Sequence, residues 1–221
     1  MTVTEKQTQL YANLMQEVKV RIDAINLALQ GRTNLATPFV RELCWLQLRM
    51  LCELVAIACL VAHGDITFLQ PHKLGRSTSA EEILDRLTRL RPHFFPIACK
   101  QILTAEGPGK FQLQPIEPSP LAKKELLDLY GKTHRHLHRG SLKAILSMDV
   151  NEPWDTKVDA PEISKWAQRI NDLLSVHMIP ISDKLMIITI LRMPMTTTKS
   201  KSQRHRPQIL CLRPSSLISV C

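Results

Sequence analysis

Apolar residues recur at helical spacing along much of the chain. Between Tyr11 and Leu29 they lie three or four positions apart with charged residues between them, which predicts an amphipathic helix. Residues 39–64 are apolar on almost all sides, a pattern typical of a central helix that its neighbours bury. Thr37 and Pro38 precede this stretch and are the predicted N-cap and first helical residue.

Two further helices begin at capping boxes. Ser79 and Asp159 are each followed three residues later by a glutamate, the spacing that satisfies free backbone N–H groups at a helix start. A third helix is predicted over residues 121–139, after Ser119 and Pro120.

In two segments the helical period is replaced by the alternation of side chains that is typical of strands. One is residues 100–116, on both sides of a Gly-Pro-Gly turn, and the other is residues 177–191, on both sides of Ser182 and Asp183. The predicted fold class is therefore mainly α: a helical bundle of five to six helices with one or two small β-hairpins. Residues 1–192 are predicted to form a single domain.

The last segment, residues 193–221, fits no predicted element. It contains five lysines and arginines and no acidic residue, so it contributes +5 of the net charge of +9. The predicted domain, residues 1–192, is therefore less basic than the whole chain suggests. We consider a disordered tail and, preferably, a segment translated out of frame after roughly residue 192. The encoding DNA tests the second hypothesis.

Composition favours a cytoplasmic protein. The N-terminus lacks the basic start and apolar run of a secretory signal. Three cysteines at helical spacing are predicted to be reduced thiols in the core: Cys44, Cys52 and Cys59. Arg49 and Glu53 interrupt the apolar helix and leave only residues 54–62 free of polar groups, far fewer than the about 20 that a membrane span needs.

The candidate chemistry lies in YGKTHRHLHRGS, residues 130–141. On a helix, His134 and His138 stack one turn apart. The adjacent stripe is predicted to be more exposed and contains Lys132, Arg135, His136 and Arg139. The predicted buried side contains Leu126, Leu129, Tyr130, Thr133 and Leu137.

Three interpretations of this stretch were weighed. A metal site needs a third ligand, and the cationic neighbours repel a metal, so we predict no metal and no cofactor. A solvated basic face is the simplest interpretation. RNA cleavage without a metal needs a general acid and base and a cation beside the phosphate, which histidine and arginine supply.

Arg49 and Glu53 bear on the same question. Charges inside so apolar a helix require partners. They either pair with each other or face the histidine-rich helix, where Glu53 would orient a histidine and Arg49 would add positive charge to a cleft.

A helix with an internal Arg-x-x-x-Glu, followed by a later helix with Tyr130 and then His138-Arg-Gly-Ser, resembles the HEPN-like helical proteins of bacteria. The resemblance covers roughly residues 10–180. It implies a helical bundle, often dimeric, whose members include metal-independent ribonucleases of defence and toxin systems and non-catalytic RNA-binding modules. The family motif places four to six residues between an arginine and a histidine; here five residues separate Lys132, not an arginine, from His138.

Two functions are therefore expected. In the first, the chain binds RNA and acts on it as a metal-independent ribonuclease. His138 and Arg139 would be catalytic, Lys132 and Arg135 would bind phosphate, and Arg49, Glu53 and His134 would support them. In the second, the chain is a non-catalytic dimeric interaction module whose polar cluster is structural.

Overall fold

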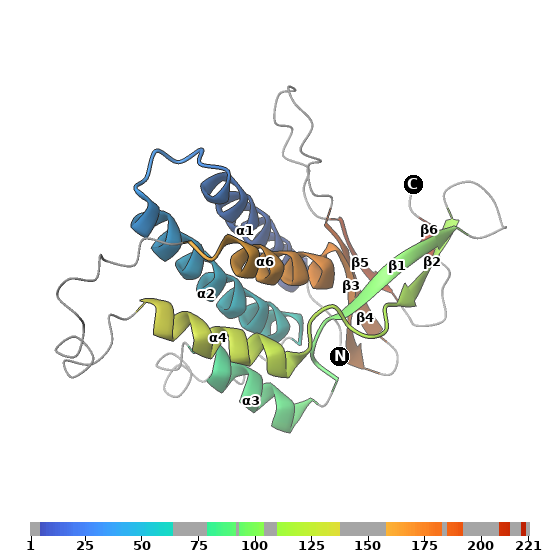
Figure 1. Ribbon diagram of the computed structural model, residues 1–221. Coiled ribbons are helices and arrows are strands. Elements are labelled where there is room, and N and C mark those ends of the chain that lie inside the picture. The colour runs from blue at the N-terminus through green and yellow to red at the C-terminus, as the bar shows by residue number, and fades with distance from the viewer. Residues whose placement is uncertain are drawn as a thin grey trace.

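The computed structural model describes residues 5–63, 79–91, 93–103, 110–137, 158–182, 185–191, 208–212 and 218–219. Within them lie five helices: α1 (Glu5–Leu29), α2 (Thr37–Ala62), α3 (Ala80–Leu90), α4 (Lys123–Leu137) and α6 (Ala160–Ser175). The strands are β1 (Ile97–Leu103), β2 (Lys110–Pro115), β3 (Val176–Ser182), β4 (Leu185–Ile190), β5 (Gln208–Leu212) and β6 (Ile218–Ser219). Figure 1 shows the helices gathered on one side of the strands.

Helix α2 is the centre of the helical layer and contacts α1, α3, α4 and α6. Its side chains are buried along almost its whole length, as the apolar pattern predicts. The cysteines Cys44, Cys52 and Cys59 are buried free thiols within it, which confirms that prediction. By length and composition α2 could also cross a membrane, but 61% of its most apolar window is buried inside the protein, and the core helix of a soluble protein passes the same test.

Two of the three predicted N-caps, Ser79, Asp159 and Thr37, are confirmed. The Ser79 hydroxyl accepts a hydrogen bond from the Glu82 backbone N–H at 3.2 Å, and the Asp159 carboxylate accepts one from the Glu162 backbone N–H at 3.2 Å. The prediction that Thr37 caps α2 is wrong. Ala36 is the N-cap without a side-chain hydrogen bond, because the helix begins one residue earlier with Thr37 and Pro38 in its first turn.

The mainly helical class is confirmed, but the predicted amount of β-structure is too small. Both predicted hairpins form, β1 with β2 and β3 with β4. They join through Ile97↔Met178 and Ala98↔His177 into a six-stranded antiparallel sheet of order β5-β4-β3-β1-β2-β6. The sheet is larger than one or two hairpins because β1 and β3, far apart in the sequence, pair with each other.

The two outer strands lie in the segment for which we predicted no element. Strand β5 pairs with β4 from Gln208↔Ile190 to Leu212↔Met186, and β6 pairs with Lys110 and Phe111 of β2. The rest of residues 193–221 lies outside the described residues. A reading-frame change and the domain boundary at residue 192 stay predictions.

The sheet has two different faces. Ile179, Ile181 and Ile187 join the core beneath the helices. Ile188 and Ile190 face the other way and form a second cluster with Phe111 of β2. This alternation along β4 is the period-2 pattern of a strand between two apolar environments.

Candidate nucleic-acid interface at the end of helix α4

Helix α4 is attached to α2 by one polar cluster. The Tyr130 hydroxyl accepts a hydrogen bond from Arg49 Nη2 at 2.7 Å and donates to Glu53 Oε1 at 3.3 Å. Arg49 Nε lies 3.3 Å from Glu53 Oε1, and the guanidinium carbon lies 4.4 Å from the centre of the Tyr130 ring. Burial raises the pKa of the Tyr130 phenol, so it stays protonated and keeps its donor.

This geometry combines both expectations for Arg49 and Glu53. The two side chains pair with each other one helical turn apart, and both face α4. Their partner on α4 is Tyr130, not a histidine, within the part of the chain that the structure describes. A role for Glu53 in orienting His138 stays a prediction, because His138 lies outside those residues.

His136 makes a contact that the sequence pattern did not predict. Its imidazole stacks on the Trp45 indole, with ring centroids 3.8 Å apart and an angle of 4° between the planes. Trp45 is fully buried and His136 is partly exposed, so this stacked pair connects the core to the predicted exposed stripe of α4. Helical spacing does not predict this contact, because Trp45 and His136 lie on different helices and the spacing describes only one helix at a time.

Positive charge converges on the same imidazole. Burial lowers the pKa of His136, and Lys132, Arg41 and Arg135 lower it further, while Glu162 alone raises it. Arg41 comes from α2 and the other two cations come from α4. Among the described residues, the charged side chains that act on the His136 imidazole are therefore three cations and one carboxylate.

Lys132 is bound to that carboxylate. Its ammonium donates to Glu162 Oε1 of α6, which also accepts from Trp166 Nε1 at 3.4 Å. The hydrogen bond from Lys132 lowers the pKa of Glu162 and keeps it ionised. A phosphate bound by Lys132 would therefore compete with Glu162.

The remaining predicted residues divide into two groups. His134 and Arg135 are exposed on α4, and Leu126, Leu129 and Thr133 are buried on its other side as predicted. Tyr130 and Leu137 were also predicted to be buried but are partly exposed. His138 and Arg139 lie outside the described residues, so the stacking of His134 on His138 stays a prediction.

In the described ranges, no group of three or more His, Cys, Asp and Glu side chains is placed to hold a metal ion.

The core contains a buried histidine, His177, that was not predicted as a candidate residue. His177 of β3 and Tyr11 of α1 are both fully buried, and the Tyr11 hydroxyl lies 2.5 Å from His177 Nε2. His177 Nδ1 lies 2.8 Å from the Leu174 carbonyl oxygen. Burial lowers the pKa of His177 to about 4. The signal was available, since His177 alternates with Ile179 and Ile181 on the core face.

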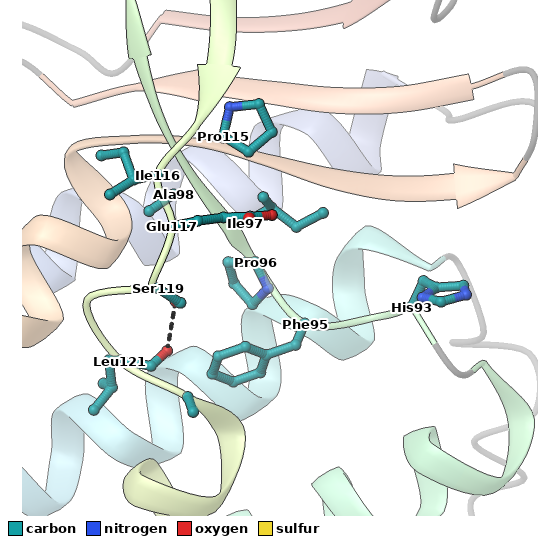
Figure 2. Close-up of a pocket in the computed structure, with 11 residues that line it drawn as sticks. His93, Phe95, Pro96, Ile97, Ala98, Pro115, Ile116, Glu117, Ser119 and Leu121 are labelled. Carbon is teal, nitrogen blue, oxygen red and sulfur yellow. Dashed lines mark hydrogen bonds between the residues drawn. The ribbon is translucent and has the colours of Figure 1, made fainter.

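An open groove lies where β1 and β2 meet the start of α4, with a volume of about 440 Å³ (Figure 2). Its walls are mainly apolar and include Phe95, Ile97, Ile116 and Leu121. His93, Glu117 and Ser119 are its polar side chains and are all exposed. The groove is at the opposite end of α4 from His136.

No protein-family model, curated protein or solved structure matches the chain. The HEPN-like resemblance and the functional roles therefore stay predictions from the sequence.

Proposed function

We propose that the chain is a HEPN-like helical domain that binds RNA at the C-terminal end of α4. It would act in the bacterial cytoplasm, within a defence or toxin system. The observation that carries the proposal is that three cations, Arg41, Lys132 and Arg135, act on His136, opposed within the described part of the chain by Glu162 alone. Such an excess of positive charge attracts the phosphates of nucleic acid.

The residues would have different roles in this interface. Arg135 is exposed and would contact phosphate, and Arg139 follows one helical turn later in the sequence. Arg49 and Glu53 hold Tyr130 and would keep α4 in place, not contact RNA. Lys132 would bind phosphate only by leaving Glu162.

Cleavage is the finer part of the proposal. His138 would serve as the general acid or base, since imidazole exchanges protons near neutral pH. Arg139 would stabilise the charge that develops on the phosphate. This mechanism is metal-independent and needs no cofactor.

One observation favours the second function, a non-catalytic dimeric interaction module. Arg49, Glu53 and Tyr130 satisfy one another, which is how a structural polar cluster behaves. If the purified protein sediments as a dimer and does not bind RNA, this function replaces the first.

RNA binding is tested by fluorescence anisotropy with a labelled RNA oligonucleotide at several salt concentrations. We expect Arg135→Ala to weaken binding about 3- to 10-fold and to reduce the slope of log affinity against log salt by about 0.7, the value for one lost phosphate contact on a single strand. The matched control is Arg89→Ala, an exposed arginine on α3. Arg89 is far from Arg135. The neighbouring Thr88 hydroxyl accepts a hydrogen bond from Lys123 at the start of α4, and Lys123 and Arg135 are separated by about 18 Å along that helix. Equal losses in both variants would contradict the proposed interface.

Cleavage is tested separately with a fluorogenic RNA in the presence of a chelator. Wild-type protein is expected to cleave it, and His138→Ala is expected to lower the rate at least about 100-fold. An inactive wild-type protein that still binds RNA would remove the nuclease and leave the binding function.

A further inference from the structure

The His136 imidazole has one sealed face and one accessible side. The ring lies parallel to Trp45 at a centroid distance of 3.8 Å, and Trp45 is fully buried. His136 is partly exposed, and because Trp45 stacks on one face of its ring, a ligand can meet the ring only at the opposite face and the edges. The end of α4 therefore presents a flat aromatic surface.

The Trp45 ring that stacks on His136 is part of the protein core. Trp45 belongs to the central helix α2 and to the main hydrophobic core. Its indole N–H has no hydrogen-bond partner among the residues that the structure describes, and its ring stacks on His136 of α4. On either side of His136 along α4, Lys132 bonds to α6 and Leu137 packs against the core. A ligand that stacks on His136 would thus lose little conformational entropy in ordering it.

An aromatic surface surrounded by cations matches single-stranded RNA. Proteins bind unpaired bases by stacking them on aromatic side chains and hold the adjoining phosphates with arginine or lysine. His136 supplies the ring, and Arg41, Lys132 and Arg135 supply the charge around it. A duplex would not fit this chemistry, because its base faces are already stacked on one another.

We propose that the outer face of His136 is the stacking platform for one unpaired base of single-stranded RNA, with Trp45 as its rigid backing. Arg135 and Arg41 bind phosphates of the same strand. This inference rests on the proposed RNA-binding function and names the form of RNA that the site takes.

The experiment compares three fluorescein-labelled ligands of one length by anisotropy: single-stranded RNA, the same ribose-phosphate backbone with abasic positions, and the corresponding duplex. Wild-type protein is expected to bind the single strand about 5- to 150-fold more tightly than the abasic strand, the range that corresponds to about 1–3 kcal/mol for a stacked base. His136→Ala is expected to lose this difference while its affinity for the abasic strand changes by less than about twofold. His136→Phe, which keeps a flat ring, is expected to retain the difference.

His93→Ala is the matched control, since His93 is an exposed histidine beside the groove at the opposite end of α4 and should leave the preference unchanged. Circular dichroism establishes that each variant is folded. If wild-type protein binds the single strand and the abasic strand equally, the platform is refuted and RNA binding stands. If His136→Ala keeps the preference, the base stacks elsewhere and the platform is again refuted. If wild-type protein binds none of the three ligands, the proposed function is refuted together with the platform.

Discussion

Tyr11 and His177 form a polar contact from which solvent is fully excluded. The Leu174 carbonyl can only accept, so His177 Nδ1 carries the hydrogen, and Nε2 accepts from the Tyr11 hydroxyl. Burial raises the pKa of Tyr11 and lowers that of His177, so both groups stay neutral. The contact fixes α1 against β3 without a buried charge.

Replacing Tyr11 with phenylalanine is expected to destabilise the protein. The Tyr11→Phe variant leaves His177 Nε2 buried without a donor, which costs about 1–3 kcal/mol of unfolding free energy. Denaturant unfolding followed by circular dichroism measures the change.

The chain supplies a matched control, because its second tyrosine, Tyr130, is only partly buried. In Tyr130→Phe, Arg49 and Glu53 remain paired with each other and solvent can reach both. The expected loss of unfolding free energy is therefore below about 1 kcal/mol. A larger loss in Tyr130→Phe than in Tyr11→Phe would contradict this account of the buried contact.

At the residue scale, the sequence predicts which side of a helix is buried better than it predicts which side chains contact each other. Helical spacing correctly placed Tyr11, Leu126 and Leu129 in the core. It could not pair Tyr11 with His177, or Trp45 with His136, because each pair joins residues from elements distant in the sequence. Such contacts depend on how the elements pack, which local periodicity does not encode.

At the element scale, α4 and α6 are joined beside the proposed interface by Lys132 and Glu162. Glu162→Gln is expected to tighten RNA binding about two- to fivefold, since it removes the one carboxylate that offsets the three cations and releases Lys132. The pair is about a quarter to a third exposed, so the unfolding free energy should fall by no more than about 1 kcal/mol. Anisotropy with the same RNA measures the affinity.

Glu125→Gln is the control for Glu162→Gln. It removes the same charge from an ion pair with Arg169 near the start of α4, far from His136. Its RNA affinity should match that of wild-type protein. If both variants tighten binding equally, the effect reflects net charge and not the local field at His136.

Elements were predictable where their signals are local. Ser79 and Asp159 cap helices because the cap and the N–H that it accepts from lie three residues apart, a distance that the sequence displays. Each hairpin was predictable for the same reason, since its turn joins adjacent strands. The pairing of Ala98 with His177, which makes one sheet from two hairpins, has no local signal.

At the scale of the whole molecule, the helices cover one face of the sheet, and the other carries its own apolar cluster of Phe111, Ile188 and Ile190. Strand β5 extends the sheet beside β4, which carries two of these side chains (Figure 1). Residues 193–221, for which the sequence predicts no element, therefore supply a strand next to this cluster. Its contribution to stability decides between a genuine tail and an out-of-frame one.

Truncation measures that contribution. A chain ending at Leu191 loses β5 and β6, whereas a chain ending at Leu212 loses β6 alone. Because β5 pairs along β4 from Met186 to Ile190, the shorter chain is expected to lose about 2–4 kcal/mol of unfolding free energy and to bind more of a hydrophobic dye. The longer chain should lose less than about 1 kcal/mol, since β6 pairs with only Lys110 and Phe111. Equal stability of all three chains would mean that β5 contributes nothing, the result that a change of reading frame near residue 192 predicts.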